Sequence, residues 1–462
     1  MKLTGTRDFY KKVLTIAVPI MIQNGITNFV SMLDNIMVGR IGTDAMSGVS
    51  IVNQLLFVFI LCLFGATAGI GIFTAQFSGK GDSEGVRYTM RMKLMVAVIL
   101  SGIGIAVLML FGDQLIKFWL RGESGTGSIA NTLTSAKRYL FVCLFEMFPL
   151  AVAMSYAGTL RETGETMLPM KAGITAVLVN LAGNYILIYG KFGAPELGVI
   201  GAALATVISR YVEAFIVIFW THSHIAKNPF AGGLYRGFYI PGDLVKKIAV
   251  KSSPVLLNEF LWSSGQTVLN QQYSLKGLDV VAAMNISSTI NNVFNIVFIA
   301  MGEAIAIIMG QELGKKMKSR KGLMEEAHQL AFFSVVICLL SGSLLFLVSV
   351  TFPEIYNTSG TIKGIATGLI RLGAVYMPLY AYENATYFTL RSGGSTWLTF
   401  VFDSLFVWVV SIPALFLLIR MTSLSVLPIF ALVQLFELIK CAIGFIMVKK
   451  GVWINDLTQY SE

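Results

Sequence analysis

The sequence predicts an all-α membrane protein with twelve transmembrane helices in two six-helix lobes that are related as parallel repeats. Three observations predict this fold class. The chain of 462 residues is 55% hydrophobic and only 13% charged, so it is far more apolar than a soluble globular protein. Its apolar residues form runs of about 20 residues, the length that one membrane crossing requires. A pattern of polar, glycine and proline positions in the first half also returns in the second half.

Twelve apolar runs follow one another along the chain. In chain order, the expected spans lie near residues 13–38, 48–75, 92–112, 138–160, 168–189, 198–220, 246–273, 282–311, 326–349, 365–390, 396–419 and 424–448. The first run continues as a complete span without a small-residue cleavage site, so we expect no removable signal peptide. The runs divide the chain into an amino-terminal lobe over residues 1–221, a connecting loop over 222–245 and a carboxy-terminal lobe over 246–462.

The basic residues indicate how the spans are oriented. Clusters of Lys and Arg precede the first span and follow the second, sixth, eighth and twelfth spans, which places all of them at one membrane face. The opposite loops hold only scattered cations, such as Arg40 and Lys191. Because cytoplasmic loops carry an excess of Lys and Arg, we expect both termini in the cytoplasm. The formal net charge of +10 then reflects topology and attraction to anionic inner-leaflet lipid, and we expect no nucleic-acid partner.

The two halves share residues at nearly constant offsets in residue number. One offset relates Pro19 to Pro254, Gly42 to Gly277, Asp44 to Asp279 and Gln76 to Gln311. A slightly smaller offset relates Thr159-Leu160-Arg161 to Thr389-Leu390-Arg391. Six spans return the chain to the same face, so the halves are expected to be parallel repeats. Proteins built this way bind their substrates near the bilayer midplane and work by alternating access.

The first span carries one carboxylate, Asp34, within the apolar stretch over residues 19–42. A charged group at this depth costs at least ~2.5–3.5 kcal/mol, so Asp34 needs a specific role. At helical spacing, Asp34 shares one face with Gln23, Thr27 and Ser31, and this face must look at protein or water. Two interpretations stay open: Asp34 handles a proton or another ion, or it is permanently paired with a donor on a neighbouring helix.

The second half carries carboxylates next to aromatic side chains. On the seventh span, Trp262 follows Glu259 by three residues, and on the tenth span tyrosines flank Glu383 at helical spacing. This combination suits a lipophilic organic cation, because cation–π contacts add about 0.5–2 kcal/mol each to the charge attraction. The alternative is an aromatic stripe that packs against neighbours. The expected substrate-binding residues are Glu259, Trp262, Gln266, Tyr380, Glu383 and Tyr387.

Other intramembrane polar groups have less specific interpretations. Asn180 and Asn184 are i, i+4 neighbours on the fifth span, and they can hydrogen-bond a carboxylate or an ion, or hold two helices together. Three further acids either titrate or pair with a donor; they are Glu146, Glu303 and Asp403. Two i, i+3 pairs near cytoplasmic helix ends are interpreted as structural; they are Arg210 with Glu213 and Glu437 with Lys440.

No enzyme signature is present in the sequence. There is no HExxH, no nucleophile elbow and no glycine-rich phosphate loop, so we expect neither catalytic residues nor a cofactor. The four cysteines lie in apolar spans at unrelated spacings and are expected to be core residues, not a disulfide or metal framework. His222 and His224 are expected to be a solvated pair in the connecting loop, and we predict no metal site.

The chain resembles the multidrug and toxic-compound extrusion (MATE) family of secondary transporters over essentially its whole length. The most specific segments are residues 33–42, LDNIMVGRIG, and residues 180–193, NLAGNYILIYGKFG. The segment around Gln76 and Gly79 and its repeat also fit. The resemblance implies a two-lobed exporter of cationic and amphipathic compounds that is driven by a proton or sodium gradient. It also implies that Asp34 is the ion-coupling carboxylate and that Asn180 and Asn184 line its pocket.

Two positions depart from the family pattern. One branch of the family has an aspartate at the position of Asn184, and the NorM-like branch has acids near the positions of Trp262 and Tyr380. The resulting expectation is a monomeric, multi-pass protein of the bacterial inner membrane that contacts membrane lipid and exports small organic cations in exchange for H⁺ or Na⁺. The alternative is a flippase for lipid-linked oligosaccharide, although such anionic cargo should require basic residues in the cavity.

Overall fold

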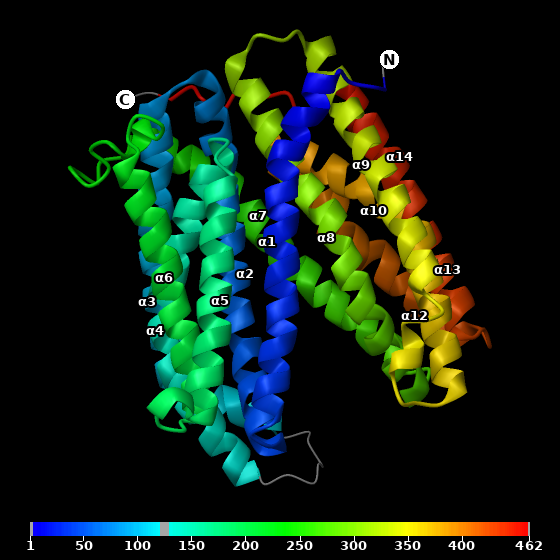
Figure 1. The fold of residues 1–462 in the computed structure, drawn as a ribbon. Coiled ribbons are helices and arrows are strands. Elements are labelled where there is room, and N and C mark those ends of the chain that lie inside the picture. The colour runs from blue at the N-terminus through cyan, green and yellow to red at the C-terminus, as the bar shows by residue number, and fades with distance from the viewer. Residues whose placement is uncertain (1–2, 121–128, 461–462) are drawn as a thin grey trace. The chain divides into compact units, whose positions relative to one another are not determined.

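The computed structural model describes residues 3–120 and 129–460, apart from the side chains of residues 32, 35 and 43 (Figure 1). These residues are almost entirely helical, and no strand occurs among them. The first half contains six long helices: α1 (Arg7–Gly39), α2 (Thr43–Lys80), α3 (Ser83–Leu120), α4 (Ile129–Glu162), α5 (Met167–Tyr189) and α6 (Val199–Ser223). Short 3₁₀ turns follow α5 and α6, at Lys191–Gly193 and Pro229–Ala231.

The second half repeats this order. Four long helices come first: α7 (Gly242–Ser274), α8 (Leu278–Lys315), α9 (Arg320–Val348) and α10 (Gly360–Ser392). A composite helix follows, made of α11 (Thr396–Phe400), two π-helical stretches (Val401–Leu405 and Val407–Ser411) and α12 (Ile412–Met421). The last span consists of α13 (Val426–Leu435) and α14 (Glu437–Lys450), and a 3₁₀ turn at Pro353–Ile355 precedes α10. The expected twelve helical spans are therefore confirmed, in the expected order.

Within the described residues, ten of these segments are long and apolar enough to cross a membrane by length and composition. The other two, α7 and α10, have 33 residues each and carry the acidic and aromatic residues that the sequence singled out for binding. Their lower hydropathy has a physical cause, since a polar face that looks into the protein does not contact lipid.

The chain divides into two compact units. The amino-terminal unit contains residues 22–74 and 82–245, and the carboxy-terminal unit contains residues 3–21, 75–81 and 246–460. Parts of α1 and α2 therefore belong to each unit. The division into lobes over residues 1–221 and 246–462, connected by a loop over 222–245, remains a prediction.

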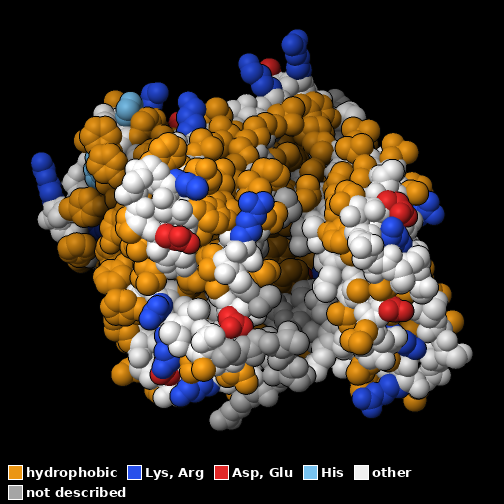
Figure 2. Space-filling model, turned by 60° about the horizontal axis from the view of Figure 1, so that its bottom comes forward, with side chains coloured by type: hydrophobic (Ala, Val, Ile, Leu, Met, Phe, Trp, Pro, Cys, Tyr) orange, Lys and Arg blue, Asp and Glu red, His pale blue; other side chains and the backbone are white. Residues whose placement is uncertain are grey.

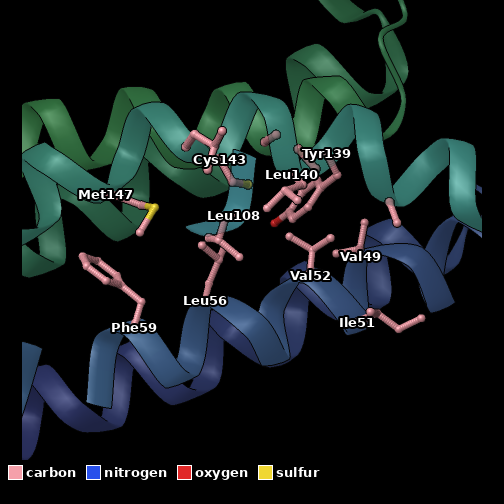
Figure 3. Close-up of a cluster of buried hydrophobic side chains, with 14 of the residues drawn as sticks. Val49, Ile51, Val52, Leu56, Phe59, Leu108, Tyr139, Leu140, Cys143 and Met147 are labelled. Carbon is pink, nitrogen blue, oxygen red and sulfur yellow. The ribbon is translucent and has the colours of Figure 1, made fainter. Parts of the chain in front are cut away.

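The amino-terminal unit has a continuous apolar core. Side chains of α2, including Val52, Leu56 and Phe59, point toward Leu140 and Met147 of α4 (Figure 3). The two backbones come close, because a Cβ on Gly48 would lie only 2.9 Å from the carbonyl oxygen of a residue on α4. Helices α4 and α5 both pack along α6. This rigid bundle holds the polar side chains of α5 and α6 in place.

In the carboxy-terminal unit, α10 packs against α8, α9 and α14. The largest core cluster of this unit joins α8 and α9 with the start of α1, through residues such as Ile16, Met301 and Leu330. Figure 2 shows hydrophobic side chains over much of the face in view, as lipid contact requires. On α3, for example, Met109 and Leu110 are 61% and 69% exposed.

Candidate functional site

Asp34 of α1 lies beside α5 in the amino-terminal unit. The amide Nδ2 of Asn184 donates a hydrogen bond to Asp34 Oδ1 at 2.7 Å. Asn180 lies one turn before Asn184 on the same face of α5, because residues four apart on a helix are neighbours. Both asparagines are buried, at 7% and 2% exposure. The structure therefore brings together the three residues that the sequence predicted for ion coupling.

The Asn180 amide completes this site, together with a residue of α6. In the orientation that satisfies both ends of the amide, Asn180 Nδ2 lies 2.9 Å from Asp34 Oδ2 and 3.1 Å from Asp34 Oδ1. Its oxygen then accepts a hydrogen bond from Thr206 Oγ1 at 3.1 Å. Asp34 thus receives donors from two amides. One buried acceptor, Asn184 Oδ1, has no hydrogen-bond partner among the described residues.

Sequence reasoning missed Thr206, and the sequence holds no signal that would have found it. Threonines in apolar helices commonly bond to the carbonyl one turn back, and the single hydroxyl proton of Thr206 can be donated to Ala202 O at 3.1 Å in place of Asn180. The Asp34 site also has charged neighbours. Arg210 of α6 pairs with Glu213 at 2.9 Å and acts electrostatically on both Asp34 and Glu146. Three acids therefore share one fixed cation in this part of the unit.

The predicted substrate-binding residues Glu259 and Tyr387 belong to one cluster in the carboxy-terminal unit. Arg391 of α10 joins them, with its Nη1 3.7 Å from Glu259 Oε1 and 3.5 Å from the Tyr387 hydroxyl. Asn258 of α7 donates to the same hydroxyl at 3.1 Å. The Glu259 carboxylate therefore has a resident cation, which the sequence did not indicate.

Glu383 belongs to a second cluster that surrounds Lys440 of α14. Lys440 Nζ lies 3.1 Å from Asp403 Oδ1, 3.8 Å from Glu383 Oε2 and 3.7 Å from Glu437 Oε2. Asn258 Nδ2 also donates to Asp403 Oδ2 at 3.1 Å, so this cluster is continuous with the cluster around Arg391. The predicted pair of Lys440 and Glu437 exists, but it is only one edge of a buried network.

The remaining predicted residues lie near these clusters but are not joined to them by hydrogen bonds among the described residues. Trp262 is 42% exposed, one turn along α7 from Glu259, and Gln266 is half-buried one turn further. The ring of Tyr380 packs against Phe298 of α8, with centroids 6.3 Å apart. The described residues contain no group of three or more His, Cys, Asp or Glu side chains that could hold a metal ion.

Comparisons with known proteins agree with this architecture. A family model described as MatE matches the chain twice, over residues 19–186 and 254–417, and the two matches begin at the paired prolines Pro19 and Pro254. Relatives include a probable multidrug resistance protein NorM from Thermotoga maritima, 25% identical over 91% of this chain and 88% of that protein. Multidrug resistance protein MdtK from Yersinia pestis is also 25% identical, over 88% of this chain and 87% of that protein.

Solved structures share the fold. A crystal structure of a MATE protein in complex with MaL6 superimposes with a TM-score of 0.85 at 18% identity, covering 98% of both chains. A transporter of the MOP superfamily from Pyrococcus furiosus gives a TM-score of 0.84 at 20% identity, covering 99% of this chain and 98% of that one. Members of this family are transporters and not enzymes. On the evidence of the repeated family match and the shared two-lobed fold, this chain belongs to the MatE family of membrane transporters.

Proposed function

We propose that this transporter is a secondary antiporter that expels cationic or amphipathic organic compounds in exchange for H⁺ or Na⁺. We place it in a bacterial inner membrane with both termini in the cytoplasm. The observation that carries the proposal is the buried site around Asp34, where a carboxylate and two amides converge from two helices. A carboxylate at membrane depth whose hydrogen-bond donors are two neutral amides is suited to taking up and releasing a cation.

The Asn180 amide offers two arrangements that match two states of Asp34. With Asp34 ionised, Asn180 Nδ2 donates to the carboxylate and its oxygen accepts from Thr206. With Asp34 protonated, the amide can turn over. Its Nδ2 then donates to Thr206 Oγ1 at 3.1 Å, and its oxygen accepts from Asn184 Nδ2 at 3.2 Å and faces the protonated carboxyl. The buried oxygen of Asn184 supplies a further ligand atom in the case of Na⁺ coupling.

Cationic cargo is supported by the charge balance of the carboxy-terminal unit. The joined clusters hold four carboxylates, Glu259, Glu383, Asp403 and Glu437, against two cations, Arg391 and Lys440. The excess of negative charge favours a positively charged compound, which would compete with Arg391 and Lys440 for the acids. The NorM and MdtK relatives are named as multidrug resistance proteins, which supports drugs as the cargo.

A flippase for lipid-linked oligosaccharide is the second candidate. The Pyrococcus furiosus transporter is described as having a binding pocket of reversed polarity, which suggests a different function for that protein. The acidic excess around Glu383 in this chain weighs against an anionic lipid-linked cargo.

The decisive experiment uses the purified protein in liposomes with an imposed pH or Na⁺ gradient and a fluorescent lipophilic cation inside. Wild type should expel the cation under one of the gradients, and Asp34→Asn should lose at least ~90% of this rate because it cannot bind the coupling ion. The matched control is Asp113→Asn, which removes an exposed carboxylate that pairs with Lys137 and should keep the rate.

Three outcomes separate the candidates. If expulsion of the cation requires both the gradient and Asp34, the result supports antiport. The gradient that drives expulsion then identifies the coupling ion. An Asp34→Asn variant as active as wild type would show that the carboxylate is structural. Wild type that moves no cation under either gradient, but exchanges a lipid-linked oligosaccharide between leaflets, would favour the flippase.

A further inference from the structure

A cavity of about 570 Å³ opens at one end of the amino-terminal unit, where α3 begins and α6 has just ended. Its walls come from α3 and from the connecting loop. The lining residues are Arg87, Arg91, Ile225, Gly232, Gly233, Arg236 and Gly237. Three of these residues are arginines and three are glycines, so the cavity combines positive charge with accessible backbone.

Arg91 gives the cavity its shape. Its guanidinium donates to three backbone carbonyls of the connecting loop, those of Gly233, Leu234 and Tyr239, each at 3.0 Å. Arg91 is only 8% exposed, and its hydrogen bonds hold the connecting loop against α3. Gly233 adopts a left-handed conformation with φ of +74°, which lets the loop turn tightly at this point.

Arg87 and Arg236 keep donors for a ligand. Toward the described residues, Arg87 donates one hydrogen bond, from its Nε to the carbonyl of Phe230 at 3.2 Å, and Arg236 is exposed at the rim. Among the described residues, no carboxylate forms an ion pair with any of the three arginines. Backbone carbonyls are dipoles and do not cancel the positive charge of Arg91. Guanidinium groups that line one cavity can donate hydrogen bonds to the oxygens of a phosphate group.

Aromatic side chains surround the same loop and point to the membrane as the source of the phosphate. Tyr235, Phe238 and Tyr239 are 55%, 64% and 64% exposed. Exposed aromatic rings concentrate at the level of lipid headgroups, where one part of the ring is apolar and another is wet. A site for a dissolved anion has no need of such rings. Basic pockets beside transmembrane helices at the cytoplasmic face suit anionic headgroups.

We propose that this cavity binds the phosphate headgroup of an anionic phospholipid of the inner leaflet, with Arg87 and Arg236 donating to the phosphate oxygens. The assignment to the inner leaflet rests on the orientation proposed above, whereas the binding itself depends only on the cavity. The bound lipid would tie the connecting loop to the membrane surface. Binding is independent of Asp34, so this site and the antiport proposal can fail separately.

The test measures lipid binding to the full-length purified protein by native mass spectrometry, with phosphatidylglycerol and phosphatidylcholine as probes. Arg87→Gln with Arg236→Gln should weaken phosphatidylglycerol binding roughly 30-fold, and Arg236→Gln alone, at an exposed position, should weaken it about fivefold. The matched control is Lys227→Gln with Lys246→Gln. It removes two exposed charges, one from the connecting loop and one from the start of α7, that do not line the cavity, and it should leave binding near wild type.

Other results would overturn the proposal. Equal binding of phosphatidylglycerol and phosphatidylcholine would show that the protein does not select an anionic headgroup. Equal losses in the arginine and lysine variants would show that the cavity is not the binding site. Displacement of phosphatidylglycerol by an equal concentration of inorganic phosphate would show a site for free anions and not for lipid.

Discussion

At the scale of single residues, two glycines explain why the segment around Gln76 and Gly79 recurs in the second repeat around Gln311 and Gly314. A Cβ on Gly79 would overlap the carbonyl oxygen of Gln311, and a Cβ on Gly314 would overlap the carbonyl oxygen of Gln76. Gly79 and Gly314 are related by the same offset as Gln76 and Gln311, so each helix presents a glycine to the glutamine of the other. The ends of α2 and α8 therefore meet backbone to backbone, through a contact in which both repeats use the same pair of residue types.

This contact predicts the effect of adding one methyl group. Gly314→Ala should lower the free energy of unfolding by about 1–3 kcal/mol, because backbone atoms cannot move aside as a flexible side chain could. Gly102→Ala on α3 is the matched control, since nothing lies within 4 Å of its Cβ position. It should leave stability unchanged or raise it by up to ~1 kcal/mol. Thermal unfolding in detergent would measure both, and equal midpoints for the two variants would contradict the close contact.

Lys440 gives a second prediction at this scale. Its ammonium group neutralises part of the charge on Asp403, Glu383 and Glu437, so Lys440→Met would leave buried carboxylates without a cation. We expect a loss of about 3–5 kcal/mol in unfolding free energy. Lys137→Met, which breaks the exposed pair with Asp113, should cost ~1 kcal/mol or less. If Lys440→Met were as stable as Lys137→Met in urea unfolding, the network would not contribute to stability.

At the scale of elements, one buried side chain of α2 bonds the carboxy-terminal segment after α14, together with contacts such as the ion pair of Lys316 with Asp456. Gln76 Nε2 donates to Ser392 O at 3.0 Å and to Asn455 O at 3.2 Å, while its Oε1 accepts from Leu457 N at 2.9 Å. Gln76 is fully buried. Within the carboxy-terminal unit, Gln76 therefore bonds two backbone groups of the segment over residues 452–460.

Gln76→Ala should loosen this segment, because two of its part-buried backbone groups, Asn455 O and Leu457 N, would lose a partner at a cost of about 1–3 kcal/mol each. Hydrogen exchange of residues 452–460 should become at least tenfold faster, with little change in α3 to α6. Gln54→Ala, at an exposed position of the same helix, is the control. Unchanged exchange in the Gln76 variant would mean that other contacts, such as the buried Trp453, hold the segment alone.

Asp456 adds a pH dependence to the same segment. Partial burial acts to raise the pKa of Asp456, but hydrogen bonds from Lys316 and Thr458 outweigh it and hold the pKa well below the usual range. A lowered carboxyl pKa gives stability that is complete above about pH 4 and is lost as the pH falls further. Protection of the segment, meaning its exchange rate relative to the intrinsic rate at each pH, should therefore stay constant from neutral pH down to about pH 4 and fall below it, and Asp456→Asn should reduce this fall.

The sequence predicted the elements better than the contacts between them. Apolar runs located all twelve spans, but α2 extends beyond the expected 48–75 to Thr43–Lys80, because polar helical turns continue outside the apolar layer. Asp34, Asn180 and Asn184 could be predicted since a charge and two amides stand out in apolar helices. The roles of Thr206 and Arg391 could not be predicted, nor could the pairing of Lys440 with Glu383 of α10 and Asp403 of the π-helical stretch Val401–Leu405. Pairing between helices depends on packing that no local pattern encodes.

At the scale of the whole molecule, each unit has an arginine at the same position of the repeat, but the two arginines contact different side chains. Arg161 Nη2 donates to Gln23 Oε1 at 2.6 Å in the amino-terminal unit. Its repeat partner Arg391 faces Glu259 in the carboxy-terminal unit. Gly173 also leaves room for Gln23, whereas the offset that relates Arg161 to Arg391 places Asp403 at the corresponding position. The two repeats therefore carry their acids at different positions, since Leu269 stands where the offset of Gln76 and Gln311 would place a partner for Asp34. This difference supports the separate tasks that we propose for the two units: ion coupling around Asp34 and cargo recognition around Glu259 and Glu383.

The orientation of the molecule gives the last prediction. If the positive-inside rule holds, the connecting loop and both termini are cytoplasmic, and the turn after α5 is external. In a chain whose four cysteines are replaced by Ala, Phe192→Cys places a thiol at a position that is 89% exposed, and Lys227→Cys places one in the exposed connecting loop. A membrane-impermeant maleimide should label Phe192→Cys in intact cells, but Lys227→Cys only after permeabilisation, while the cysteine-free chain stays unlabelled. The reverse pattern would invert the membrane orientation, and the lipid cavity around Arg87 would then face the outer leaflet.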